Sequence, residues 1–169
     1  MWSDASLASV APHVFAGCVL AAVRSATPGM PADETACPPF ARGRWLLSHN
    51  GRVDRSRLPD AAWRRAESVC DSAVLAAELL DGDPVADLAD QVARLAAADP
   101  DARLNLLLAD GQRLIATAWG DTLSTLCAGD GIVVASEPYD DDPGWREVPD
   151  HTLVTVTAAG ITLTPLESS

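Results

Sequence analysis

Positive charge is scarce in this sequence. It contains no lysine, and its 12 basic residues, all arginine, are outnumbered by 24 acidic residues, which gives a formal net charge of −12. Nucleic-acid-binding proteins neutralise phosphates with clusters of lysine and arginine, so this balance argues against a nucleic-acid partner. The one dense group of arginines lies between residues 42 and 65. We interpret it as a solvated region that could also attract an anionic substrate.

Long apolar runs and metal-binding patterns are also missing. No apolar run reaches the ~20 residues that a membrane-spanning helix needs, so no membrane partner is expected. The four cysteines have neither the spacing of a metal site nor that of a disulfide framework, which favours a reducing, cytoplasmic setting. The run Asp140-Asp141-Asp142 lacks the alternate spacing and distal glutamate of a calcium loop. We therefore expect no metal and no cofactor.

What is present indicates one globular domain. The chain has 169 residues, of which 48% are hydrophobic, and a mean hydropathy of +0.08. This length suits one hydrophobic core and is short for two ordinary domains. The composition is that of a folded chain and not of a disordered one.

The periodicity of apolar residues predicts a mixed α+β fold. Helices are expected over 71–80 and 85–98, with a weak one over 6–15. A loop rich in proline and glycine spans 27–39. Strands are expected over 18–23 and 44–49, and then as three hairpins: 104–109 with 113–119, 122–127 with 132–136, and 153–157 with 161–163.

The tripeptide His49-Asn50-Gly51 closes the predicted strand 44–49. An asparagine followed by glycine can present a side-chain amide and an unobstructed backbone N–H to one oxygen, as an oxyanion hole does. Asn-Gly is also a common turn dipeptide, and the sequence alone leaves that interpretation open. Arg24 follows the predicted strand 18–23, and its guanidinium could hold a carboxylate.

Asp71 stands at the start of the predicted helix 71–80. An acidic residue at this position can accept hydrogen bonds from free backbone N–H groups, so one interpretation is a simple helix cap. The alternative is that its carboxylate faces a ligand beside Asn50.

Three short motifs occur in a fixed order along the chain. They are Arg-x-Ala-Thr-x-Gly from Arg24, Ser-His-Asn-Gly from Ser48, and Ser-x-x-Asp-Ser from Ser68 ahead of a helix. That order resembles the glutaminase domain of class II glutamine amidotransferases, in the N-terminal-nucleophile hydrolase superfamily. The later stretch 133–149, with its Ser-Glu-Pro-Tyr-Asp-Asp-Asp-Pro-Gly-Trp core, is similar to the EgtC-type γ-glutamyl amidases of ergothioneine biosynthesis. The resemblance runs from about residue 2 to residue 166.

The resemblance implies roles for particular residues. Asn50 and Gly51 would form the oxyanion hole, and Arg24 would hold the α-carboxylate of a glutamyl group with the Thr27 hydroxyl nearby. Asp71 would receive the α-ammonium. His49 would lie at the substrate site as a neighbour of the hole, although in principle it could serve a nearby cysteine. Pairing both charges would select γ-glutamyl groups, because an unpaired charge in a partly buried pocket is costly.

The resemblance also implies a nucleophile, which in this superfamily is the side chain of the first mature residue, a cysteine in this family. The sequence begins Met1-Trp2-Ser3 and offers no such group. We expect residues 1–169 to form one glutaminase-like domain without its N-terminal nucleophile segment, and to be inactive alone. The implied fold is an αββα sandwich of mainly antiparallel sheets, N-terminally incomplete. None of the four cysteines is a convincing substitute.

The expected reaction is hydrolysis of a γ-glutamyl amide with release of glutamate. For the EgtC type, the implied substrate is γ-glutamyl-hercynylcysteine sulfoxide. Two alternatives remain open: a glutamine amidotransferase subunit that supplies ammonia to a synthase, and a non-catalytic remnant that only binds glutamyl ligands. A homodimer is also possible.

Overall fold

The computed structural model describes residues 7–23, 31, 33–129 and 131–167. Its α-helices are α1 (Leu7–Val10), α2 (Asp60–Arg65), α3 (Asp71–Leu79) and α4 (Pro84–Ala98), and 3-10 turns span Ala11–His13, Glu34–Ala36 and Arg55–Arg57. The strands are β1 (Phe40–Arg42), β2 (Trp45–Arg52), β3 (Arg103–Ala109), β4 (Leu114–Ala118), β5 (Ser124–Ala128), β6 (Gly131–Ala135), β7 (Arg146–Glu147), β8 (Thr152–Thr157) and β9 (Gly160–Pro165).

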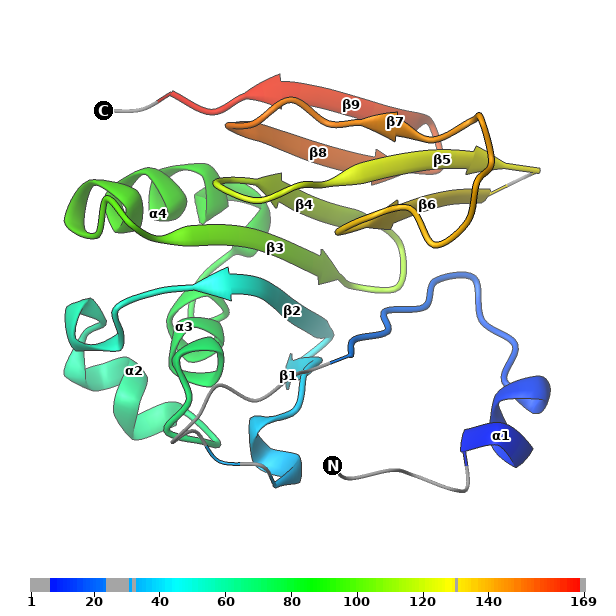
Figure 1. Cartoon of the computed structure of the whole chain (residues 1–169). Coiled ribbons are helices and arrows are strands. Elements are labelled where there is room, and N and C mark those ends of the chain that lie inside the picture. Colours follow the sequence, from blue (N-terminus) through cyan, green and yellow to red (C-terminus); the bar gives the residue numbers. More distant parts are fainter. Residues whose placement is uncertain (1–6, 24–30, 32, 130, 168–169) are drawn as a thin grey trace.

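The strands form two antiparallel sheets. The larger sheet has the order β1-β2-β3-β4-β8-β9, and the smaller one has the order β6-β5-β7. In Figure 1, helices α2, α3 and α4 gather beside β2 and β3, while β5, β6 and β7 lie over the β4 and β8 end of the larger sheet. This arrangement is an α+β sandwich and confirms the fold class expected from the sequence.

Two hydrophobic cores hold these layers together. Alternate residues of β3, Leu104, Leu106 and Leu108, are fully buried on the helix side together with buried residues of α3 and α4. On the other face, Ala116 of β4 and Val154 of β8 pack in a second core with Val134 of β6. The period-two pattern of an antiparallel strand therefore supplies one apolar face to each core.

Local capping explains where the helices begin. The Asp83 carboxylate accepts a hydrogen bond from the Val85 N–H at 3.0 Å, and Pro84 occupies the first turn of α4, where a missing N–H costs nothing. Cys70 is the N-cap of α3 and makes no side-chain cap. Asp71 is thus the first helical residue, and the simple N-cap interpretation of Asp71 is wrong.

The N-terminal part differs from the sequence expectation. The predicted strand 18–23 is not a strand, because its residues pair with no other strand in the described part of the chain. In Figure 1 this segment is irregular. An apolar run alone does not make a strand, because a strand also needs a hydrogen-bonded neighbour. The weak helix over 6–15 is reduced to α1 and one 3-10 turn.

The interpretation of Asn50-Gly51 as a turn is also wrong. β2 continues through Arg52 and pairs with β3 from Leu46 to Arg52, with Asn50 opposite Asn105 and Gly51 opposite Leu104. Elsewhere the predicted hairpins are confirmed as β3–β4, β5–β6 and β8–β9. Within the described residues, no helix is both long enough and apolar enough to cross a membrane.

Candidate active site

The end of β2 carries the predicted oxyanion-hole residues. The Asn50 side chain is exposed and has no hydrogen-bond partner among the described residues, so its amide is available as a donor. Strand alternation places Asn50 on the face opposite the buried residues Leu47 and His49. The amide therefore points away from the helix layer.

Gly51 is the one residue type that fits its position. Its φ is +151°, and a Cβ there would lie 2.1 Å from the Arg103 carbonyl oxygen and 3.0 Å from His49 Nε2. No side chain can be added at such a distance without moving the backbone of β2 or β3. The glycine of Asn-Gly is required here by the close approach of two strands and not by a turn.

His49 is buried beneath Asn50, with 8% of its surface exposed. Its Nδ1 lies 2.9 Å from the Ser72 hydroxyl, and its Nε2 lies 2.8 Å from the Arg103 carbonyl oxygen. Burial lowers the pKa of His49 below 6.5, although the Arg103 carbonyl and the Asp71 charge oppose that shift. Both ring nitrogens are engaged by the protein, which leaves neither for direct contact with a substrate.

Asp71 lies where α3 begins, against the strand end that follows Gly51. Its Oδ1 accepts a hydrogen bond from the Ser72 N–H at 2.9 Å, and its Oδ2 accepts one from the Val53 N–H at 3.3 Å. The carboxylate is half-buried. The structure thus brings His49, Gly51 and Asp71 to one place, where β2, β3 and the first turn of α3 meet.

Other predicted site residues are not placed. Arg24 and Thr27 lie outside the described residues. Two contributors escaped the sequence analysis. The hydroxyl of Ser72 could have been found as the last residue of the Ser-x-x-Asp-Ser motif, whereas the backbone carbonyl of Arg103 leaves no trace in a sequence.

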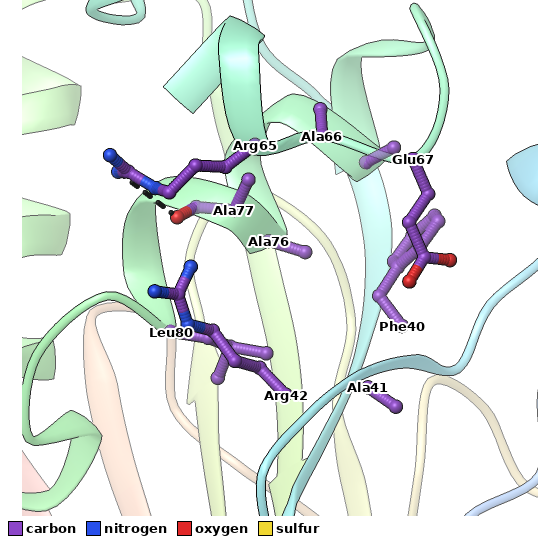
Figure 2. Close-up of a pocket in the computed structure, with 10 residues that line it drawn as sticks. Phe40, Ala41, Arg42, Arg65, Ala66, Glu67, Ala76, Ala77 and Leu80 are labelled. Atoms are coloured by element: carbon purple, nitrogen blue, oxygen red, sulfur yellow. Dashed lines mark hydrogen bonds between the residues drawn. The ribbon is translucent and has the colours of Figure 1, made fainter. Parts of the chain in front are cut away.

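A small cavity elsewhere is unrelated to these residues. It has a volume of about 50 Å³ and lies between β1, α3 and the end of α2, with Arg42, Arg65 and Glu67 among its lining residues (Figure 2). Arg42 and Arg65 are both paired with Asp81, at 2.7 and 3.1 Å. The cavity has room for a few water molecules only, and none of the predicted site residues lines it.

None of the four cysteines takes part in a catalytic arrangement with the described residues. All four are free, and Cys70, the neighbour of Asp71, is 1% exposed. In the described part of the chain, no group of three histidine, cysteine or acidic side chains is arranged to hold a metal ion.

Comparison with known proteins gives no matching family model but close curated relatives. The chain is 58% identical over 167 residues to the gamma-glutamyl-hercynylcysteine sulfoxide hydrolase of Mycobacterium tuberculosis, covering 99% of this chain and 70% of that protein. It is 55% identical over 166 residues to the enzyme of the same name from Mycolicibacterium smegmatis, covering 98% of this chain and 72% of that protein.

Solved structures with the same fold include glutamine amidotransferases. A glutamine aminotransferase class-II domain protein from Silicibacter pomeroyi matches with a TM-score of 0.61 and 27% identity, over 81% of this chain and 74% of that one. The glutamine phosphoribosylpyrophosphate amidotransferase of B. subtilis also matches with a TM-score of 0.61, at 19% identity, over 74% of this chain and 30% of that one. The chain therefore belongs to the gamma-glutamyl-hercynylcysteine sulfoxide hydrolase family and has the class II glutamine amidotransferase fold.

Proposed function

We propose that this protein hydrolyses the γ-glutamyl amide bond of γ-glutamyl-hercynylcysteine sulfoxide and releases glutamate. The observation that supports the proposal is the position of Asn50-Gly51 near the end of β2, two residues before Val53, whose N–H donates to the Asp71 carboxylate at the start of α3. A site of this composition has a donor for a developing oxyanion and an anion for an ammonium group.

The free α-amino acid end of the substrate gives the site its selectivity. Asp71 receives the α-ammonium, Arg24 holds the α-carboxylate, and Thr27 adds a hydroxyl contact. An ordinary peptide lacks the free ammonium and carboxylate at these positions, and it would leave the charges of Asp71 and Arg24 unpaired. His49 acts on the site through its contacts with Ser72 and the Arg103 carbonyl, without touching the substrate.

The reaction proceeds by acyl transfer through a thiol. A cysteine thiolate attacks the γ-carbonyl carbon, and the carbonyl electrons move onto oxygen, where the Asn50 amide and the Gly51 N–H stabilise them. The C–N bond then breaks, and the amine leaves with the proton that the nucleophile's amino group had accepted. Water hydrolyses the resulting thioester through a second tetrahedral intermediate. The thiol belongs to an N-terminal cysteine, a role that we assign to none of the four cysteines in this chain.

The setting of the reaction follows from charge and cysteine chemistry. We place it in the cytoplasm, because all four cysteines are free thiols. The net charge of −12 argues against a nucleic-acid partner. We propose a homodimer as the assembled form, with the exposed apolar segment 14–23 as the surface that joins the copies.

A glutamine amidotransferase is the second candidate, favoured by the names of the structural neighbours. The two candidates differ in the amine that leaves. The test compares glutamate release from γ-glutamyl-hercynylcysteine sulfoxide and from glutamine, using the chain alone and the chain preceded by a cysteine-initiated segment. Preference for glutamine would favour the amidotransferase, and no release from either substrate would favour a glutamyl-binding remnant.

Substitution of Asn50 then tests the site. In the active form, Asn50→Ala should lower kcat by roughly 10²–10³ with a smaller change in KM, because the oxyanion exists only along the reaction path. Gln112→Ala is a matched control: it removes another exposed amide, in the β3–β4 turn at the far end of β3 from Arg103. Equal effects of the two substitutions would contradict the assignment.

A further inference from the structure

His49 is positioned to act on the site without touching a substrate. It belongs to β2, one residue before Asn50, and it faces the helix layer beside the buried Leu47. Its ring spans the space between the first turn of α3 and the first residue of β3, with contacts of 2.9 Å to Ser72 Oγ and 2.8 Å to the Arg103 carbonyl. One side chain therefore links three elements.

The partners of the ring define its tautomer. A backbone carbonyl can only accept a hydrogen bond, so Nε2 must carry the proton that is donated to Arg103. In a neutral imidazole, Nδ1 is then a lone-pair acceptor, and the Ser72 hydroxyl must donate to it. Protonation would turn Nδ1 from acceptor to donor, and the Ser72 hydroxyl would then accept, so the direction of this hydrogen bond depends on the charge of the ring.

The surroundings favour that neutral form. Burial lowers the pKa of His49, and the Arg103 charge acts in the same direction. The carboxylates of Asp71 and Asp121 and the Arg103 carbonyl act in the opposite direction and are outweighed. The imidazole is thus uncharged at neutral pH and can hold one fixed arrangement of donors and acceptors.

The Arg103 carbonyl, which accepts the hydrogen bond from His49, also leaves no room for a side chain at Gly51. A Cβ on Gly51 would meet the Arg103 oxygen at 2.1 Å and His49 Nε2 at 3.0 Å, so these groups are packed against one another. The other end of the link, Ser72, directly follows Asp71, whose carboxylate accepts the N–H groups of Ser72 and Val53. Movement of the ring would therefore shift Asn50-Gly51 relative to Asp71.

We propose that His49, held by Ser72 and the Arg103 carbonyl, is a positioning residue that sets the distance between the Asn50-Gly51 oxyanion donors and the Asp71 carboxylate. This inference rests on the proposed function, because the two ends of the link matter together only if one ligand spans them. Ser72 acts with His49, as the donor that fixes the ring.

Paired substitutions separate the contact of His49 with the Arg103 carbonyl from its contact with Ser72. In His49→Gln, the amide nitrogen reaches the position of Nε2 and keeps a donor for the Arg103 carbonyl, whereas in His49→Asn the amide reaches only the position of Nδ1. In the chain preceded by a cysteine-initiated segment, we expect His49→Asn to lower kcat by about 10- to 100-fold, since misplacement of about 1 Å can cost 10²-fold. His49→Gln should keep more of the activity. Ser72→Ala should lower kcat, and Ser72→Thr should recover it.

A matched control distinguishes positioning from general stability. Thr117→Val removes another buried polar contact to β3, where the Thr117 hydroxyl donates to the Leu104 carbonyl at 2.5 Å and accepts from the Leu106 N–H at 3.1 Å. Both of these hydrogen-bond partners belong to β3. We expect it to lower the melting temperature without the loss of kcat that His49→Asn causes.

Nitrogen NMR of the ring supplies a readout that does not need activity. In the 169-residue chain labelled at histidine, His49 should show the Nε2–H tautomer at neutral pH. The Nδ1 signal of His49 should shift in Ser72→Ala. An Nδ1–H tautomer or a charged ring would overturn the proposal, as would a folded His49→Asn enzyme with wild-type kcat. Failure of the proposed function would instead appear as absence of glutamate release by the wild type, whatever the tautomer.

Discussion

At the residue scale, Gly51 shows how a sequence motif and its structural cause can differ. Asn-Gly is a turn dipeptide in most contexts. Here the glycine lies inside β2, opposite Leu104, and its hydrogen is all that fits against the Arg103 carbonyl. The glycine therefore permits two strands and the His49 ring to approach closely beside the candidate catalytic amide.

Gly51→Ala should destabilise the protein. The added methyl would overlap the Arg103 oxygen, so the strands must separate, which typically costs about 1–3 kcal/mol. Gly111→Ala is the control, because Gly111 also has a positive φ, +85°, but has nothing within 4 Å of its Cβ position. Urea denaturation of both variants measures the difference. A loss in Gly51→Ala no larger than that in Gly111→Ala would show that contact with Arg103 is not limiting.

At the scale of elements, one carboxylate joins two hairpins. Asp110 directly follows β3, and its Oδ1 accepts hydrogen bonds from the Gln112 and Arg113 N–H groups at 3.0 and 2.9 Å. Its Oδ2 lies 2.7 Å from Arg44, in the β1–β2 turn, and 2.9 Å from Arg113 Nε. Burial by itself raises the pKa of Asp110, but these hydrogen bonds and the Arg44 charge outweigh burial and lower it to about 2.

This shift predicts a pH dependence of stability. The pKa of Asp110 in the folded protein lies below the ordinary value of 3.8 for an aspartate. The ionised carboxylate therefore stabilises the fold above about pH 5, and this contribution is lost as the pH falls toward 2. A lowering of this size corresponds to about 2 kcal/mol. Asp110→Asn should be less stable than wild type by about that amount at pH 7, and the difference should shrink toward pH 2. Denaturation at several pH values checks this, and a constant difference would refute it.

Helices and strands could be predicted from the sequence where the apolar pattern extends over many residues. The prediction failed where hydrogen bonding to a neighbouring strand decides whether a segment is a strand. α3, α4 and the three C-terminal hairpins follow from their apolar patterns and turn residues. The two- and three-residue strands β7 and β1 carry too few residues for a pattern, and they exist because β5 and β2 offer partners. The segment 18–23 has the pattern without a partner in the described structure.

At the scale of the whole molecule, the apolar surface is unevenly covered. The two cores bury most large apolar side chains of the sheets, yet Phe15, Val19 and Val23 are 90%, 67% and 103% exposed. Exposed apolar residues that follow one another along a segment mark an interaction surface more strongly than scattered ones do.

We expect the 169-residue chain to self-associate through this segment. Each such side chain contributes about 1.5–3 kcal/mol when fully buried. Replacing Phe15, Val19 and Val23 together with serine should therefore weaken association by about tenfold or more. Tyr139→Ser is the control, since Tyr139 is exposed on a separate loop. Sedimentation velocity over a range of concentrations measures this, and a wild-type chain that stays monomeric would contradict the prediction.

The sequence by itself determined the family and most of the regular elements, because motif order and apolar periodicity are local properties that a single chain carries. It also located Asn50, Gly51 and Asp71 as residues of interest. Only the tertiary structure decided that β2 runs on through Arg52, that Gly51 faces a carbonyl of another strand, and that His49 joins Ser72 to Arg103. These outcomes depend on which backbone groups come together in space. Every residue has a backbone carbonyl, so the sequence could not single out that of Arg103.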